Sequence, residues 1–192
     1  MAQARGNTRQ RIQDVALELF AEQGYEKTSL REIAERLDVT KAALYYHFKT
    51  KEDIIIGIFQ DLARPIDELV AWAAEQPRTL ETKKEILRRY HSALTDAAPL
   101  FRFMHENQAT VRDLSIGLTF KERFVALNEF IQDPAAPIKD KVRAVSAIFA
   151  LHAGTFFMQN IEGDPEEKQE AVLEVALDLI EQAEQAKQAK QA

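Results

Sequence analysis

Residues 28–51 constrain the fold most strongly, because they carry explicit start and stop signals for two short helices. Ser29, followed three residues later by Glu32, has the sequence of a capping box, which starts a helix. The apolar residues that follow recur at the spacing of one helix face: Leu30, Ile33, Ala34 and Leu37. Asp38 tolerates the left-handed conformation that ends a helix, and Thr40 is a suitable N-cap for the next one. The segment therefore predicts two short helices joined by a tight turn.

The second of these helices, expected over residues 41–48, is unusually polar and aromatic. At about 100° per residue, Leu44 and Phe48 share one side and should anchor the helix in a core. At least one of Tyr45 and Tyr46 must then face outward, whichever way the helix is rotated. Outward hydroxyl groups can donate to phosphate oxygens, and such a helix fits the major groove of DNA. The alternative is an aromatic helix packed inside a bundle.

A longer pattern surrounds these two helices and resembles a known family. It runs Gly24-Tyr25-x-x-Thr28-Ser29-x-x-x-Ile33-Ala34-x-x-Leu37-x-Val39-Thr40-x-x-x-Leu44-Tyr45-Tyr46-His47-Phe48-x-x-Lys51-Glu52. This pattern is similar to the DNA-binding domain of tetracycline-repressor-type (TetR family) transcriptional regulators, and it covers roughly the first quarter of the chain. The family often has glycine where Asp38 and Ala43 stand here. The turn should survive at Asp38, whereas the methyl group of Ala43 alters how closely the helix approaches bases.

The resemblance implies a set of DNA-contacting residues and a palindromic operator in double-stranded DNA as the partner. Base edges would be met by Arg31, Lys41, Ala42, Ala43 and Tyr45. The sugar-phosphate backbone would be met by Thr28, Ser29, Thr40, Tyr46, His47, Lys49 and Lys51. Phosphate contacts fix the register on the duplex, and Arg31 is the best candidate for a bidentate contact to guanine.

The charge of the chain is unevenly distributed. The 192 residues carry a formal net charge of −6, so the whole protein lacks a basic signature. Residues 27–51, however, hold six basic and three acidic side chains and carry +3, which leaves −9 on the remainder. Such a polarity would direct one face towards DNA and hold the acidic part away from it. The alternative is a chance cluster of solvated charges.

Composition excludes several other classes. With no cysteine, the chain has neither a disulfide framework nor a cysteine-based metal site, and we expect no metal and no cofactor. No apolar run approaches the length of a membrane span, so we expect a cytoplasmic protein without membrane contact. The four histidines are scattered, and neither a phosphate-binding glycine loop nor a nucleophile elbow is present. We therefore expect no enzymatic activity, although a small helical enzyme stays open as a competing class.

The remainder of the chain reads as a succession of helices, punctuated by prolines that include Pro65, without the alternation or hairpin signals of a sheet. We expect helices near residues 80–97, 99–108, 117–132, 138–161 and 166–187. The fold class is therefore all-α. An N-terminal three-helix helix-turn-helix domain over residues 1–52 should precede a C-terminal helical domain over residues 53–192, which the resemblance assigns to effector binding and dimerisation.

The last two long helices carry extended apolar stripes. The resemblance implies that they meet their twins in a four-helix interface between two protomers of a homodimer. The interface residues expected from these stripes are Val145, Phe149, Phe157, Val172, Val175, Ala176, Leu179, Ile180 and Ala183. The alternative, which the pattern leaves equally open, is that both stripes pack inside one chain.

The middle of the chain is rich in aromatic residues with a few polar neighbours. The resemblance implies a C-terminal pocket for a small, largely apolar effector, and cavities lined in this way suit such molecules. The residues expected there are Phe101, Phe103, Met104, His105, Phe120, Phe124, Phe149, His152 and Phe156; taken singly, such residues are more often ordinary core than ligand contacts. The expected function is thus a ligand-responsive transcriptional repressor that the effector releases from DNA. A helical protein–protein interaction or scaffold module without DNA binding is the alternative.

Overall fold

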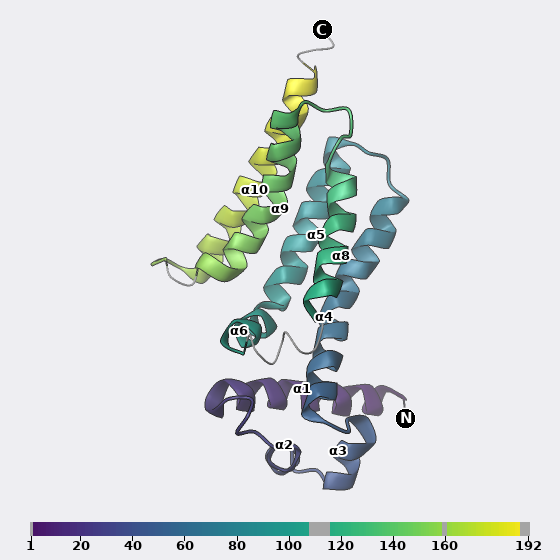
Figure 1. Cartoon of the computed structure of the whole chain (residues 1–192), viewed down its shortest axis with the longest axis vertical. Helices are drawn as coiled ribbons and strands as arrows, with labels where there is room; N and C mark the ends of the chain where they lie inside the picture. The colour runs from purple at the N-terminus through teal and green to yellow at the C-terminus, as the bar shows by residue number, and fades with distance from the viewer. Residues whose placement is uncertain (1, 108–115, 159–160, 189–192) are drawn as a thin grey trace. The chain divides into compact units, whose positions relative to one another are not determined.

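The computed structural model describes residues 2–107, 116–158 and 161–188, without the side chains of residues 2–7, 102, 105, 116–120, 155–157 and 186–188. Every element in these ranges is a helix, as the sequence predicted (Figure 1). In chain order they are α1 (Ala2–Gln23), α2 (Leu30–Arg36), α3 (Lys41–His47), α4 (Lys51–Ala74), α5 (Leu80–Asp96), α6 (Ala98–Glu106), α8 (Ile116–Ile131), α9 (Ile138–Phe157) and α10 (Pro165–Gln188). The last five begin within one residue of their predicted starts.

The described chain divides into two compact units. The N-terminal unit comprises Met1–Ala63 together with Pro99–Gly117, and the C-terminal unit comprises Arg64–Ala98 together with Leu118–Ala192. Helix α4 therefore contributes to both units. The functional division predicted at residues 52 and 53 remains a proposal.

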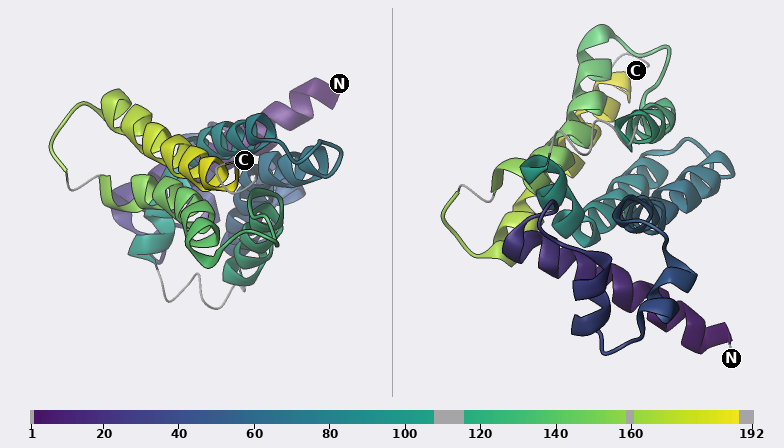
Figure 2. Two further views of the ribbon diagram at one scale, coloured as in Figure 1. Left: turned by 90° about the horizontal axis from the view of Figure 1, so that it is seen from above. Right: turned by 60° about the horizontal axis from the view of Figure 1, so that its bottom comes forward.

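The core of the N-terminal unit is built from an apolar stripe of α1 and from the short helices beside it (Figure 2). Its buried side chains include Ile12, Ala16, Leu19 and Phe20 of α1, Ile33 and Ala34 of α2, and Leu44 of α3. Gly24 ends the α1 segment at a φ of 89°, a conformation that glycine adopts without a steric penalty.

Helix α6 belongs to this unit, which the sequence did not predict. The ring of Phe103 lies 5.5 Å from that of Phe20 and 5.9 Å from that of Tyr25, and its side chain is buried. Phe101 is buried as well and falls in the same unit. Both residues had been expected in a C-terminal pocket. They lie in the N-terminal unit because residues 99–107 group with residues 1–63, where Phe103 packs against Phe20 of α1.

Helix α4 runs through Pro65, where the sequence suggested a break. Proline lacks an amide hydrogen and costs about 3 kcal/mol inside a helix. Apolar side chains buried on both sides of it, among them Ile58 and Ala63 before and Ile66 and Leu69 after, offset that cost. Packing thus overrides a local helix breaker.

The C-terminal unit centres on α9 and α10, which pack closely together and against α5 (Figure 1). Their contact is tightest at Gly154, where a Cβ atom would lie 2.6 Å from Cγ1 of Val172. Lys83 of α5 is buried, and its ammonium group donates to Glu184 of α10 at 2.5 Å. The N-terminus of α10 is capped by Asp164, whose carboxylate accepts from the amides of residues 166 and 167.

One predicted dimer stripe is largely internal. Four of its members are buried between α10 and its neighbours within the chain: Val172, Ala176, Ile180 and Ala183. For these four the intramolecular alternative holds, because α5 and α9 cover them. Leu179 and Val145 are half-buried, whereas Phe149 and Val175 remain exposed. The side chain of Phe157 lies outside the described part of the structure.

Candidate functional site

Helices α2 and α3 are started by the caps that the sequence predicted. The Ser29 hydroxyl accepts from the Glu32 amide at 3.2 Å, and the Glu32 carboxylate accepts from the Ser29 amide at 2.7 Å. The Ser29 hydroxyl also donates to the Glu32 carboxylate at 2.7 Å, and this hydrogen bond, followed by the one from the Ser29 amide, lowers the pKa of Glu32. Asp38 adopts a φ of 54° in the turn, and the Thr40 hydroxyl accepts from the Ala43 amide at 3.1 Å. The helix-turn-helix is therefore encoded by local hydrogen bonds.

Two side chains seat α3, as predicted. Leu44 is 0 % and Phe48 2 % exposed. Gly57 of α4 lies against Phe48, where a Cβ atom would come within 3.0 Å of the ring, and the guanidinium of Arg9 stacks on that ring at 4.6 Å. No sequence signal indicated the contacts of Phe48 with Gly57 and Arg9, because both join the end of α3 to distant helices.

The opposite side of α3 faces solvent. Tyr46 is 68 % exposed, and Lys41 and Ala42 are exposed beside it. Ala43, Tyr45 and His47 are half-buried on the flanks. The Lys41 ammonium lies 5.5 Å from the centre of the Tyr45 ring, and the rings of Tyr46 and His47 meet edge to face at 5.2 Å. The helix thus presents small, cationic and phenolic groups on one surface.

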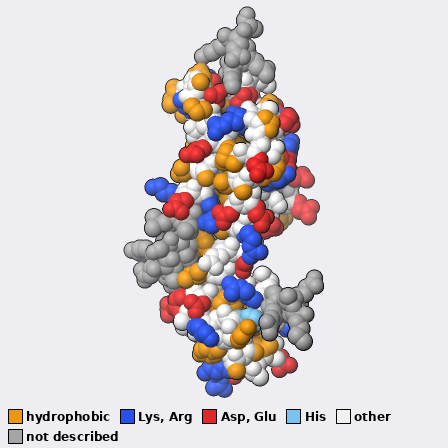
Figure 3. Space-filling model, turned by 90° about the vertical axis from the view of Figure 1, so that its right-hand side faces the viewer, with side chains coloured by type: hydrophobic (Ala, Val, Ile, Leu, Met, Phe, Trp, Pro, Cys, Tyr) orange, Lys and Arg blue, Asp and Glu red, His pale blue; other side chains and the backbone are white. Residues whose placement is uncertain are grey.

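Basic side chains flank this surface. Arg31 of α2 is exposed and forms an ion pair with Glu35 at 2.7 Å, which raises the pKa of its guanidinium. Such an exposed pair contributes little to stability because water screens it, so Arg31 can exchange its partner for a base edge at little cost. Lys49, just after α3, is exposed and donates to the Tyr45 carbonyl. Figure 3 shows Lys and Arg side chains gathered at the lower end of the N-terminal unit, where α2 and α3 lie.

Lys51 and Thr28 are engaged inside the protein. The Lys51 ammonium donates to the Tyr25 carbonyl at 2.7 Å and lies 4.3 Å over the Tyr25 ring. Tyr25 in turn donates to Glu52 at 2.9 Å, and burial raises the pKa of its phenol. Thr28 is 2 % exposed, and its hydroxyl donates to the Gly24 carbonyl at 2.9 Å. The structure therefore gives Thr28 no exposed group for a phosphate, and its side chain joins α1 to α2 instead.

Asp53 caps α4 together with Thr50. Its carboxylate accepts from the amides of Lys49 and Thr50, each at 3.0 Å, while the Thr50 hydroxyl accepts from the Asp53 amide at 3.0 Å. This reciprocal pair holds the segment between α3 and α4, and with it the position of Lys49. The polar surface of α3 is thus fixed at both ends.

The C-terminal unit brings together part of the predicted ligand group. The Phe124 ring lies 5.1 Å from Phe149 and 5.6 Å from His152. The Tyr90 hydroxyl and Nε2 of His152 are 2.7 Å apart. Burial lowers the pKa of His152 to about 4 and raises the pKa of Tyr90, so both groups are neutral near pH 7. Met104 is half-buried in the N-terminal unit, and the side chains of His105, Phe120 and Phe156 lie outside the described part.

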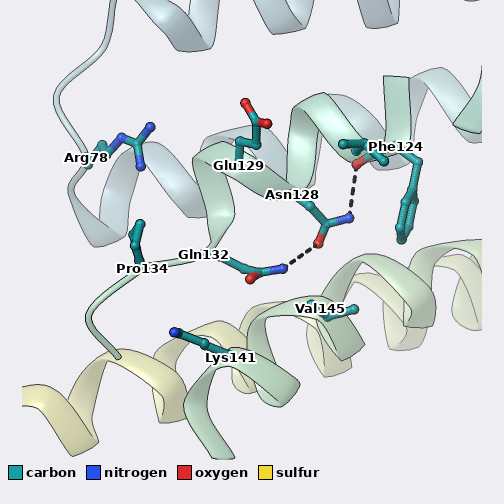
Figure 4. A pocket seen from close by; sticks show the side chains of 9 residues that line it. Arg78, Phe124, Asn128, Glu129, Gln132, Pro134, Lys141 and Val145 are labelled. Carbon is teal, nitrogen blue, oxygen red and sulfur yellow. Dashed lines mark hydrogen bonds between the residues drawn. The ribbon is translucent and has the colours of Figure 1, made fainter. Parts of the chain in front are cut away.

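An open cleft of about 660 Å³ lies in the same unit, beside Phe124 (Figure 4). Its lining comes from α8, α9 and the segments that precede α5 and α9: Arg78, Phe124, Val125, Asn128, Glu129, Gln132, Pro134, Lys141 and Val145. Of these, only Phe124 had been predicted as a ligand contact. The available sequence signal was the pair Asn128 and Gln132, two carboxamides four residues apart at the end of α8.

A smaller hollow of about 330 Å³ lies in the N-terminal unit, between α1 and α6. Phe103 lines it together with Leu17, Ala21 and Pro99. Among the described residues, no group of three or more acidic or histidine side chains could hold a metal ion. Within the same residues, no helix is both long and apolar enough to cross a membrane.

Comparison with known proteins links the N-terminal region to one family. Residues 12–58 match the family described as bacterial regulatory proteins, tetR family. The HTH-type transcriptional regulator AcrR of Shigella flexneri is 50 % identical over 62 residues, which cover 32 % of this chain and 29 % of that protein. The HTH-type transcriptional repressor KstR2 of Rhodococcus jostii is 31 % identical over 127 residues, which cover 57 % and 62 %. The chain thus spans less than two thirds of the length of these relatives.

Solved structures show the same fold over most of the chain. A transcriptional regulator from Aquifex aeolicus VF5 superposes with a TM-score of 0.68 at 24 % identity, covering 90 % of this chain and 99 % of that one. A complex of SmeT with triclosan gives a TM-score of 0.66 at 20 % identity, covering 91 % and 90 %. At such identities, the likeness establishes the all-helical architecture of both units.

Proposed function

The N-terminal domain of this chain belongs to the tetR family of bacterial regulatory proteins, and from that premise we propose that the protein is a transcriptional repressor that binds a palindromic operator as a homodimer. The family consists of DNA-binding regulators, not enzymes. The protein would act in the cytoplasm, where its operator is accessible. A small effector bound in the C-terminal unit would release it from DNA.

The exposed face of α3 carries this proposal. A seven-residue helix is far too short to be stable alone, and here Leu44 and the adjoining Phe48 hold it. Its aromatic Tyr46 is nevertheless left in solvent, although burial of an aromatic ring stabilises a fold. The exposed face of α3 thus carries an aromatic side chain with Lys41 and Lys49 nearby, and such a surface suits contact with a polyanion.

A homodimer would explain the exposed apolar residues of α9 and α10. Val142 and Phe149 of α9 are 57 % and 55 % exposed, and Val175 of α10 is 52 % exposed. Exposed apolar side chains gathered in this way mark interaction surfaces. Two-fold pairing through these helices would present two copies of α3 to half-sites about 34–36 Å apart.

Effector control would be a shift between two dimer states. The effector would bind better to a state whose α3 helices do not match adjacent major grooves, so DNA affinity would fall by the same coupling factor. The SmeT complex with triclosan shows a small molecule bound to a protein of this fold, which supports the proposal of an effector here.

The direct test selects DNA sequences from a random duplex pool with the purified protein and measures affinities by fluorescence anisotropy. We expect a preferred palindrome and a log-log salt dependence that falls linearly. Arg31→Ala should weaken operator binding and relax sequence preference by about 1–3 kcal/mol, whereas Lys49→Ala should weaken all sequences alike and flatten the salt dependence. A protein without duplex affinity, or equal losses on operator and random DNA for Arg31→Ala, would favour the helical interaction module instead.

A further inference from the structure

We propose that the cleft between α8 and α9 binds an amphiphilic carboxylate: a small molecule with one anionic head group and an unbranched apolar tail of about ten carbons. The proposal rests on the proposed function, because it names the chemical class of effector that the C-terminal unit would take. It also adds an anionic head group to the small, largely apolar effector expected from sequence.

The cleft is polar at one end and apolar at the other. In Figure 4, Arg78 and Lys141 lie at the end marked by Pro134, Asn128 and Gln132 lie along the middle, and Phe124 lies at the far end. Asn128 donates to the Phe124 carbonyl at 3.0 Å and accepts from Gln132 at 3.4 Å. These hydrogen bonds fix the Asn128 side chain in the wall of the cleft. They do not involve Arg78 or Lys141, so both cations can bind a ligand.

Neither cation is neutralised by a carboxylate of the described residues. Within the described chain, no carboxylate lies within salt-bridge distance, 4.0 Å, of the Arg78 guanidinium or the Lys141 ammonium. Arg78 instead stacks on the Phe130 ring at 5.9 Å, which leaves its hydrogen-bond donors unused by that contact. Glu129 also lines the cleft but pairs with neither cation, so the lining carries a formal charge of +1.

These charges decide between an anionic and an uncharged ligand. An apolar ligand seated over Arg78 and Lys141 would remove water from two cations without replacing the lost hydrogen bonds, which is unfavourable. A carboxylate would accept charge-assisted hydrogen bonds from both, and the planar guanidinium can provide two of them to one carboxylate. The arrangement therefore favours an anion at this end.

The apolar end and the length of the cleft define the tail. From Phe124 to Gln132 the axis of α8 rises eight residues, about 12 Å at 1.5 Å per residue. With carbon–carbon bonds of about 1.5 Å, a zigzag chain of about ten carbons spans the same length. Phe124 and Val145 provide apolar contacts along it, and the volume of about 660 Å³ lies within the range of ligand pockets.

The experiment titrates three ten-carbon probes into the full-length protein by isothermal calorimetry, without DNA and below their micelle concentrations. The probes are decanoate, decan-1-ol and decyltrimethylammonium, which share a tail and differ in head-group charge. We expect decanoate to bind about tenfold more tightly than decan-1-ol, with decyltrimethylammonium the weakest. Because no DNA is present, a failure here leaves the DNA-binding proposal untouched.

Two variants locate the site. Lys141→Gln and Arg78→Gln should each weaken decanoate about five- to tenfold and change decan-1-ol by less than about twofold. Lys139→Gln is the matched control, since Lys139 is an exposed lysine of α9 outside the lining. Unchanged thermal melting would show that the variants fold. Equal affinity for decanoate and decan-1-ol, tighter binding of the cation, or an equal loss in Lys139→Gln would each overturn the proposal.

Discussion

Replacing Leu44 with alanine should loosen α3 selectively, because this side chain is fully buried and α3 has only seven residues. The change removes three carbon atoms, worth about 0.8 kcal/mol each in transfer free energy, or about 2.4 kcal/mol in total. The cavity left behind raises the expected loss of stability into the range of about 2–5 kcal/mol. Since the N-terminal unit is small, this loss should unfold α3 locally and abolish tight DNA binding.

Tyr46→Ala is the matched control on the same helix. Tyr46 is 68 % exposed, so its removal should change the free energy of unfolding by less than about 0.5 kcal/mol, while a loss of phosphate contact weakens DNA binding. The two variants should therefore separate stability from recognition: one loses both, and the other loses DNA affinity alone.

Urea unfolding followed by two signals provides the measurement. Trp72 is the single tryptophan and lies in the C-terminal unit, so its fluorescence reports that unit, while circular dichroism reports all helices. For Leu44→Ala we expect an early loss of helical signal that the Trp72 fluorescence does not share. If Leu44→Ala cost less than about 1 kcal/mol, or if Tyr46→Ala cost as much, the assignment of the buried and exposed faces of α3 would be refuted.

Three further predictions concern the C-terminal unit. Burial lowers the pKa of His152 to about 4, below the ordinary value of 6.5, so the folded state binds fewer protons between these values. The stability contributed by neutral His152 should be complete above pH 6.5 and should fall by about 3 kcal/mol as the pH drops through 4; His152→Gln should remove that slope in urea titrations at several pH values. Gly154→Ala should cost about 1–3 kcal/mol by overpacking against Val172, and Val172→Ala added to it should recover stability in the same denaturation assay; additive losses would contradict the contact. Val142→Glu should shift the protein towards monomer in sedimentation experiments while the circular dichroism spectrum stays helical, and an unchanged assembly state would argue against the α9 face as the dimer contact.

The local signals in the sequence predicted local structure well. The capping box at Ser29, the left-handed Asp38 and the N-cap at Thr40 all have the predicted conformation. The seating of α3 by Leu44 was predictable for the same reason, since helical periodicity places it with Phe48 on one side. Caps, turns and periodicity involve neighbours within about four residues, so one sequence suffices to locate them.

The sequence did not predict which distant helix buries a given apolar side chain. Phe103 carries the same apolar signal as Phe124, yet one packs on Phe20 in the N-terminal unit and the other borders His152 in the C-terminal unit. The apolar stripe of α10 likewise did not reveal that α5 and α9 would cover Val172. An apolar side chain indicates burial, but its own sequence neighbourhood does not name the helix that buries it.

The amino-acid sequence by itself determined the helices, their caps and the amphipathic α3 that places Tyr46 in solvent, because each of these follows from interactions within one or two helical turns. Only the tertiary structure decided that Thr28 turns inward and that Arg78 and Lys141 line the same cleft, because these depend on how helices far apart in sequence pack. Which of several similar apolar faces pack together depends on all helices at once, so the pattern within one helix does not predict it.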